Sequence, residues 1–429
     1  MRLLINVLLS CPTMNELPHK NRRRWLSFSL RGMLVLMTIL CVFLGWIGPK
    51  WMEMKREEAA AKKIQEAGGW VIYDYHKEHD STTSDEQPVP HGHYVLRYLF
   101  GEHIFSRVVE IFFRDEGSPN RVAAEFPKLK QLNHLAFLGR DILTDESIDH
   151  LTHIRNLATV RFFCASISPE QLKTLSQVET IEHLSLDGKT GTDFHLAQLP
   201  YFNNLKSLRL YSRFATDIGM QSIGNTESLE ELELHGIPNV TDQGVSALTG
   251  LRHLKKVVTL SGFGGSNRLT ENCLPDFVKI TSLENLYLSF DNSRVDFRED
   301  QYQDFASLKT LKHLNLSSSN IRDAALREIG RLHQLKSLDL SFTHITDEGL
   351  SYLSPLSHLT SLSLHGSEVT DEGLSLLPKF ESLRELSIYD RENVTEACLN
   401  RHGFHKATNE IFLFVRDSNV DSPSRGTRN

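Results

Sequence analysis

The chain has 429 residues, of which 40% are hydrophobic and 24% are charged. That composition excludes a disordered chain and a membrane protein with many spans. The cysteines are too few and too scattered for a disulfide framework or a CxxC zinc site: Cys11, Cys41, Cys164, Cys273 and Cys398. Residues 1–63 hold a charge balance of +7 and the whole chain is −7, so residues 64–429 carry −14. An acidic body of this kind predicts no nucleic-acid partner.

The first element is an apolar run at 32–48, which has no charged residue. Counting back through Leu26–Leu30, with Arg31 as the one interruption, lengthens it to about 23 residues, against the roughly 20 that span a bilayer. Arg22–Arg24 precede it, and Trp25, Trp46 and Trp51 stand where interfacial aromatic residues belong. We therefore expect a single transmembrane helix at 32–48.

Other interpretations of the amino-terminal region are weaker. A buried core helix would show a polar face, and a cleaved signal peptide needs small residues directly after the run, where Pro49 and Lys50 stand. The stretch before Cys11 is too short for a lipoprotein signal. Basic residues flank the run on both sides, but the compact arginine cluster favours a cytoplasmic amino terminus at 1–31 and a body outside the cytoplasm.

Residues 49–107 read as a juxtamembrane helix and an amino-terminal cap. The segment 50–67 is rich in helix formers and ends at Gly68, and 70–75 has the composition of a strand. The segment 76–93 is polar and punctuated by prolines, which indicates a loop. It contains four histidines that fit no metal-ligand spacing: His76, His79, His91 and His93.

From Val108 the chain repeats one pattern: an apolar residue, two others, an apolar residue, one other and an apolar residue. Successive repeats begin 24, 25, 24, 24, 24, 25, 29, 28, 24, 24 and 24 residues apart. Seven of the eleven intervals are identical, which indicates a solenoid of stacked units. In 335–340, Leu338 and Leu340 point to one face of a short strand, and Ser337 and Asp339 point to the other.

A helix follows each strand in this pattern. In 343–353, Thr346 and Asp347 are expected to cap the helix, and Leu350 and Leu353 to form its buried face. Aspartates recur at the same place and receive the same capping role: Asp145, Asp217, Asp242, Asp347 and Asp371. Cys273 and Cys398 align with the glycines of this element, which indicates a small buried position.

These residues resemble the leucine-rich repeat family, in the class with a Thr-Asp-x-Gly-Leu element, over about 108–404. The resemblance implies an α/β solenoid (horseshoe) with a concave parallel β-sheet and convex helices, here preceded by the transmembrane helix. The whole chain resembles membrane-anchored bacterial leucine-rich repeat proteins. Serine, threonine, arginine or isoleucine replaces the asparagine of the family's ladder at several turns. The repeat domain is placed at 108–416, with a closing strand in 410–417 and a disordered tail at 417–429.

No catalytic or metal motif is present in the sequence. His134, His183 and His313 recur at one repeat position, which is an effect of register. We therefore expect no enzyme activity, no cofactor and no metal. An adaptor of the ubiquitin system is disfavoured because the anchor occupies the place of its docking helices.

Residues at outward strand positions do not pack in the core, so we take them as candidate partner-binding residues. Arginine and tyrosine, which are enriched in binding hot spots, recur among them: Arg161, Phe163, Arg209, Tyr211, Glu231, Glu233, His235, Tyr287, His365 and Tyr389. Two insertions, 261–268 and 291–304 with Tyr302, are expected beside them. The hypotheses are a non-catalytic, membrane-anchored scaffold that binds a protein through its concave face, and an extracytoplasmic sensor or binder of cell-wall or extracellular carbohydrate.

Overall fold

The computed structural model describes residues 30–78, 106–115, 117–140, 142–260, 268–289, 299–376, 380–388, 393–406 and 413–416. The chain divides into two compact units, Met1–Arg56 and Glu57–Asn429. Over the described residues, the second unit holds one sheet of fifteen strands, which follow one another in chain order except that β15 lies between β13 and β14.

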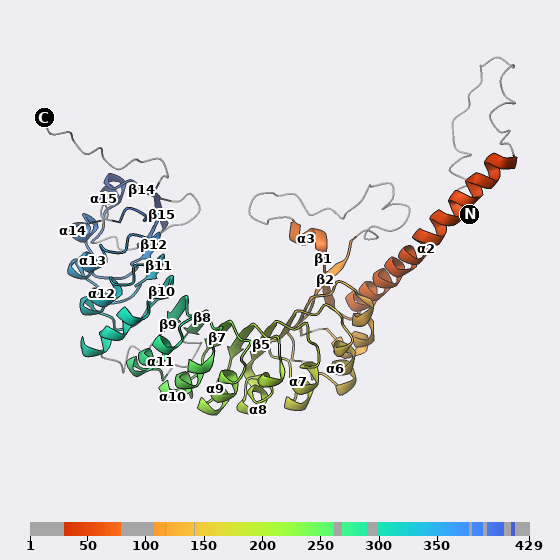
Figure 1. The fold of residues 1–429 in the computed structure, drawn as a ribbon, viewed down its shortest axis with the longest axis horizontal. Helices are drawn as coiled ribbons and strands as arrows, with labels where there is room; N and C mark the ends of the chain where they lie inside the picture. Colours follow the sequence, from red (N-terminus) through yellow and green to blue (C-terminus); the bar gives the residue numbers. More distant parts are fainter. Residues whose placement is uncertain are drawn as a thin grey trace, which may run out of the picture. The chain divides into compact units, whose positions relative to one another are not determined.

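Twelve of these strands, β2 to β13, are parallel to one another, as the repeat pattern predicts. They lie along the inner side of the second unit (Figure 1). Their bounds are Val108–Phe113 (β2), His134–Phe137 (β3), Thr159–Phe162 (β4), His183–Asp187 (β5), Ser207–Tyr211 (β6), Glu231–His235 (β7), Lys256–Leu260 (β8), Asn285–Leu288 (β9), His313–Asn315 (β10), Ser337–Asp339 (β11), Ser361–Ser363 (β12) and Glu385–Ser387 (β13).

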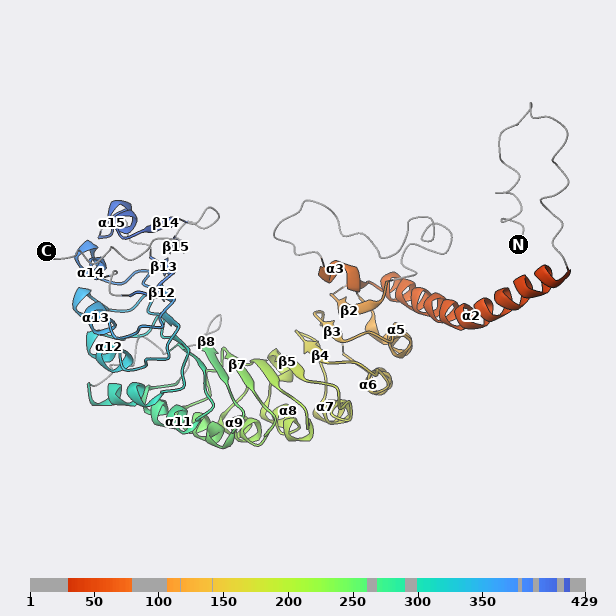
Figure 2. The same cartoon turned by 45° about the horizontal axis from the view of Figure 1, so that its top comes forward.

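Short helices cover the outer side of this sheet (Figure 2). The α-helices are Pro119–Val122 (α5), Asp145–Thr152 (α6), Pro169–Leu175 (α7), Asp193–Leu196 (α8), Asp217–Gly224 (α9), Asp242–Ser246 (α10), Leu274–Lys279 (α11), Asp323–Ile329 (α12), Asp347–Tyr352 (α13), Asp371–Leu374 (α14) and Glu396–Arg401 (α15). Short 3₁₀ helices occur at Ala123–Lys128, Gly188–Thr190, Leu199–Tyr201, Ala247–Gly250, Glu271–Cys273 and Glu299–Ser307, named η1 to η6.

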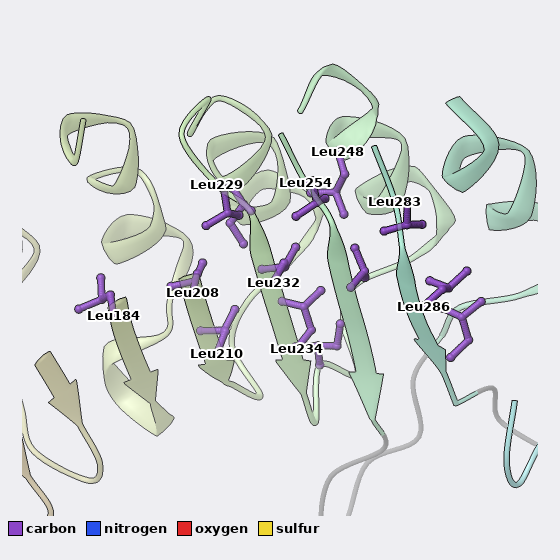
Figure 3. Packing of buried hydrophobic residues seen from close by; sticks show 14 of the residues in the cluster. Leu184, Leu208, Leu210, Leu229, Leu232, Leu234, Leu248, Leu254, Leu283 and Leu286 are labelled. Atoms are coloured by element: carbon purple, nitrogen blue, oxygen red, sulfur yellow. The ribbon is translucent and has the colours of Figure 1, made fainter. Parts of the chain in front are cut away.

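The core lies between the sheet and the helices. Alternate strand residues point into it, because successive side chains of a strand face opposite ways. Leu208, Leu232 and Leu286 occupy one register position on β6, β7 and β9, and all are fully buried (Figure 3). Leu338 and Leu340 are buried as expected. Cys273 and Cys398 are also buried, which confirms the small interior position inferred from the repeat.

Antiparallel strands close both ends of the parallel array. At the first end, β1 (Gly69–Tyr73) pairs antiparallel with β2. At the other end, β15 (Leu413–Arg416) pairs antiparallel with β13 and also with β14 (Phe404–Lys406). The expected closing strand in 410–417 is therefore present, whereas β14 was not expected.

The helix α2 (Leu30–Glu66) precedes the sheet, and its last residues belong to the second unit. Ala60, Ala61 and Ile64 are buried in the core of that unit. The chain leaves the helix through Gly68, whose φ of 82° suits glycine. The short helix α3 (Asp74–Glu78) follows β1 and contains His76, while His79, His91 and His93 lie outside the described residues.

None of the helices, over the residues that the structure describes, is long and apolar enough to cross a membrane. The expected spanning segment at 32–48 falls mostly on positions whose side chains lie outside that description. The tail at 417–429 lies outside it as well.

The repeated aspartates do not cap their own helices, so that interpretation is wrong. For the five aspartates named from the sequence, the preceding threonine is the N-cap, as Thr346 is for α13. Asp323 is preceded by Arg322 instead. The carboxylate of the aspartate instead accepts hydrogen bonds from the backbone N–H and the hydroxyl of the corresponding threonine in the next repeat. The pairs are Asp193–Thr216, Asp217–Thr241, Asp242–Thr270, Asp323–Thr346, Asp347–Thr370 and Asp371–Thr395. Asp145 accepts from the side chain of Gln171 in the next repeat.

Candidate interaction surface

The face of the sheet opposite the helices, here called the inner face, carries the outward strand residues in three rows. Strand pairing aligns each row across neighbouring repeats. Over β4 to β8 the first row is Thr159, His183, Ser207, Glu231 and Lys256; the second is Arg161, Ser185, Arg209, Glu233 and Val258; the third is Phe163, Asp187, Tyr211, His235 and Leu260. The candidate residues on these strands therefore share one face.

Glu233 is the centre of a charged cluster on this face. The Nε–H group of Arg209 donates to Glu233 Oε2 at 2.5 Å, and Lys256 Nζ donates to Glu233 Oε1 at 2.7 Å. Burial alone would raise the pKa of Glu233, but the hydrogen bonds and charges of Arg209 and Lys256 outweigh it and lower the pKa to about 2. The same contact with Glu233 raises the pKa of Arg209. Both members of this pair are ionised at neutral pH.

An aromatic cluster lies beside these charges in the third row. The rings of Tyr211 and His235 stack with their centroids 4.2 Å apart and an interplanar angle of 7°. Phe163 meets Tyr211 edge to face at 6.5 Å, and 46% of its surface is exposed. Such aromatic pairs contribute about 0.5–1.5 kcal/mol beyond the burial of area. The cluster is held in place without any role in the core.

His235 joins the two clusters. Its Nε2 lies 3.8 Å from Glu233 Oε2 and has no hydrogen-bond partner over the described part of the chain. Burial lowers the pKa of His235; Glu233 raises it, and the charges of Arg209 and Lys256 lower it again. The ring is therefore neutral at pH 7 and stacks on Tyr211 as an uncharged group.

The structure brings together only part of the predicted set. Arg209, Tyr211, Glu233 and His235 are in direct contact through the pairs above, and Phe163 touches Tyr211. Arg161 lies two strands from Arg209, and Tyr287 lies two strands from Glu233. Glu231 is exposed in the first row, and His365 lies beyond β12. Tyr389 lies outside the described residues.

Lys256 is a cluster member that the sequence interpretation missed. It occupies an outward position in register with Glu231, so the repeat pattern could have identified it. The sequence interpretation favoured arginine and tyrosine as hot-spot residues and did not consider lysine.

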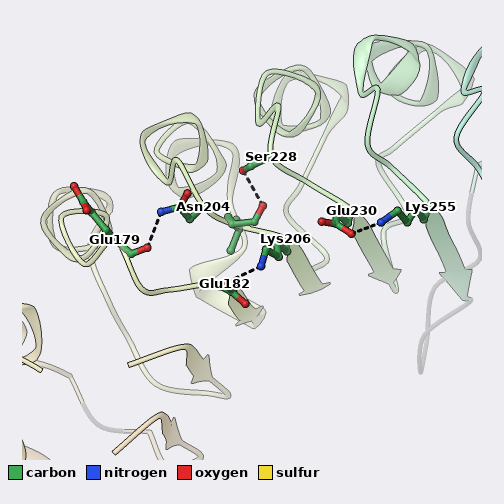
Figure 4. A network of polar contacts seen from close by, with 8 residues as sticks. Glu179, Glu182, Asn204, Lys206, Ser228, Glu230 and Lys255 are labelled. Atoms are coloured by element: carbon green, nitrogen blue, oxygen red, sulfur yellow. Dashed lines mark hydrogen bonds and ion pairs between the residues drawn. The ribbon is translucent and has the colours of Figure 1, made fainter. Parts of the chain in front are cut away.

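A row of ion pairs lies where the strands begin (Figure 4). Glutamate and lysine alternate just before the first row, and neighbouring repeats pair them as Glu182–Lys206, Glu230–Lys255 and Glu284–Lys312 at 2.6, 2.6 and 2.8 Å. These pairs are exposed, and exposed pairs contribute little, typically ~0–1 kcal/mol. They therefore make this margin of the sheet polar but contribute little to stability.

The two insertions have different outcomes. Residues 261–267 and 290–298 lie outside the described residues. The rest of the second insertion belongs to η6, where Tyr302 is 2% exposed and packs in the core. Tyr302 is therefore not exposed beside the candidate residues, because this end of the insertion continues into the 3₁₀ helix of its repeat.

The described residues contain no group of three or more His, Cys, Asp or Glu side chains that could hold a metal ion. His134, His183 and His313 each begin a strand and lie in the first row, in agreement with a register effect. The inner face can offer hydrogen-bond donors, paired charges and aromatic contacts to a partner.

Comparisons with known proteins concern the repeats. Residues 199–401 match the family described as leucine-rich repeat region. No curated protein matches the chain. Among solved structures the chain is similar to the internalin InlF of Listeria monocytogenes, with 17% identity, a TM-score of 0.41, and coverage of 69% of this chain and 94% of that one.

Two further structures have similar values. Internalin C2 of Listeria monocytogenes shows 22% identity and a TM-score of 0.39, with coverage of 57% of this chain and 92% of that one. A chain of the yeast Rad7 and Elc1 complex shows 16% identity and a TM-score of 0.44, with coverage of 86% and 96%. Likenesses at this level assign no partner or activity. The repeating strand–helix unit of the fold agrees with the match of residues 199–401 to the leucine-rich repeat region.

Proposed function

We propose that the protein is a non-catalytic scaffold that binds a protein partner through its inner face. The observation that carries the proposal is the cluster of Phe163, Arg209, Tyr211, Glu233 and His235 over β4 to β7. These side chains contact one another outside the core, so the fold does not need them for packing. Aromatic and arginine side chains that are already held in place lose little entropy when a partner binds.

A site-specific photo-crosslinker tests which face is used. We would place it at Tyr287 on the inner face and, as a control, at the exposed Gln221 on the outer helix α9. The expected result is an adduct of defined mass from position 287 alone, lost when Tyr211→Ala removes the centre of the aromatic cluster. Adducts from position 221 alone, or adducts from 287 that survive Tyr211→Ala, would contradict the proposal.

A carbohydrate ligand is the alternative. Sugars bind to open ring faces, and the stacking of Tyr211 on His235 covers one face of each ring. The arrangement of these rings therefore favours the protein partner. Binding of soluble cell-wall fragments that depends on Phe163 would reverse this preference.

We further propose that residues 32–48 hold the protein in a membrane, with the repeats outside the cytoplasm. The support is the uncharged run itself and the preceding arginine cluster. Protease added to intact spheroplasts should degrade the chain beyond residue 70, and the amino-terminal fragment should resist extraction at alkaline pH. Full protection of the repeats would contradict the proposed orientation, and extraction of the intact chain would contradict the anchor.

A further inference from the structure

A strip of hydrogen-bond donors crosses the inner face on three neighbouring strands, β4, β5 and β6. The first two rows on these strands contain no carboxylate. They consist of Thr159, His183, Ser207, Arg161, Ser185 and Arg209. We call Arg161, Ser185 and Arg209 the Arg–Ser–Arg strip; strand pairing puts them side by side in the second row.

Several hydrogen-bond donors of the strip have no acceptor over the described residues. Over the described part of the chain, the side chains of Arg161 and Ser185 make no hydrogen bond or ion pair, and Arg161 is exposed. Arg209 gives its Nε–H to Glu233, and this contact orients the guanidinium while its two Nη groups remain for another acceptor. The only carboxylate of the third row on these strands, Asp187, accepts from the backbone N–H of Gly188.

Other parts of the inner face have a different character. On β10 and β11 the second row holds Asn315 and Asp339, which bond to each other at 2.9 Å. On β7 the first two rows hold Glu231 and Glu233. An excess of cationic donors is therefore a local property of β4 to β6 and does not follow from the repeat.

The spacing of the strip limits its ligand. Neighbouring strands lie about 4.8 Å apart, so the backbones at Arg161 and Arg209 are roughly 10 Å apart with Ser185 between them. A single carboxylate or phosphate group does not fill both guanidinium forks at that spacing, since each fork takes one planar anion in a two-pronged contact. Phe163 and Tyr211 lie next to the two arginines on the same face and add apolar contacts.

We propose that the Arg–Ser–Arg strip binds an acidic segment of the protein partner, with one side-chain carboxylate on Arg161, another on Arg209, and the apolar parts of the segment against Phe163 and Tyr211. This assignment rests on the proposed scaffold function and specifies its partner. Charge complementarity carries it: over the described residues Arg161 has no carboxylate partner, and Arg209, although its Nε–H is bonded to Glu233, keeps its two Nη groups for another acceptor.

The test uses the full chain and a fluorescein-labelled oligoglutamate peptide as the probe, with oligolysine and inorganic phosphate as comparisons. We expect oligoglutamate to bind and oligolysine not to bind. Arg161→Gln and Arg209→Gln should each weaken binding by about tenfold or more, because each removes a charged hydrogen-bonding group. Added salt should weaken binding by the wild type. Arg155→Gln, which removes the same charge from an exposed turn before β4, should have no effect.

Equal binding of the two peptides, or unchanged binding by both arginine variants with normal thermal unfolding, would overturn the assignment. So would complete displacement of the peptide by phosphate at equal concentration, which would indicate a site for a free anion. The crosslinking experiment separates the two proposals: a Tyr287 adduct that depends on Tyr211 but is unaffected by Arg161→Gln and Arg209→Gln leaves the scaffold in place and removes the acidic segment.

Discussion

At the scale of single residues, contacts between neighbouring repeats explain why the Thr-Asp-x-Gly element contains these residue types. A Cβ added at Gly349 would overlap Oδ1 of Asp323 from the preceding repeat, and one added at Gly373 would overlap Oδ1 of Asp347. The equivalent Gly219 donates its backbone N–H to Asp193 Oδ1 at 3.0 Å. At Gly349 and Gly373 the neighbouring carboxylate therefore occupies the space that a side chain would take.

Gly349→Ala should therefore destabilise the protein by about 1–3 kcal/mol, the usual cost of overpacking. Gly250→Ala is the matched control, since no atom lies within 4 Å of a Cβ at that position. Urea unfolding of the two variants measures the difference. Equal midpoints would mean that Asp323 moves aside without cost.

Glu233 predicts a pH effect. Its pKa in the folded protein is about 2, below the ordinary value of 4.5, so its contribution to stability is fully present above pH 4.5 and is lost as the pH falls toward 2. We expect roughly 1–2 kcal/mol, less than full linkage, because Arg209 and Lys256 are partly exposed and screened. Glu233→Gln should lose less unfolding free energy than the wild type between about pH 6 and pH 3. Parallel pH profiles of the two proteins would contradict this.

At the scale of elements, each short strand separates a core face from the inner face. On β11, Leu338 is 1% exposed, whereas Ser337 beside it is half-buried on the inner face. A shift of one residue in register would exchange the two faces. On each strand, one set of alternate residues therefore packs in the core, and the other set lies on the inner face.

Leu338→Ala should cost roughly 2–5 kcal/mol through the cavity that it leaves. Ser337→Ala should be close to neutral, within about 0.5 kcal/mol. Thermal unfolding of both variants is the measurement. Similar losses would show that the inner face also carries stability.

At the scale of the whole repeat domain, the ends of the sheet need protection, because an unpaired edge strand can template association. Strands β14 and β15 cover the last parallel strand and bury Phe404 and Phe414. Terminal units of this kind stabilise a solenoid whose repeats contact only their neighbours.

Truncation after residue 402 should lower the unfolding temperature and promote self-association, measured by calorimetry and light scattering. Truncation after residue 416 removes only the tail that the sequence predicts to be disordered, and should change neither. A stable monomer from the shorter chain would mean that β13 tolerates an open edge.

The sequence by itself determined the repeat, the parallel strands, the buried leucines and the small interior position of Cys273 and Cys398. These follow from periodicity, since residues about 24 apart occupy equivalent places in stacked units. It also identified the outward positions that Arg209 and Tyr211 occupy.

The tertiary structure alone decided which outward residues meet. Glu233 is held by cations from the strand before and the strand after it, and Tyr211 stacks on a histidine 24 residues away. Tyr302 packs in the core, and the aspartates accept hydrogen bonds from threonines of the next repeat instead of capping their own helix. Periodicity specifies the position of a residue in the repeat, whereas the direction and partner of its side chain depend on the neighbouring repeat packed against it.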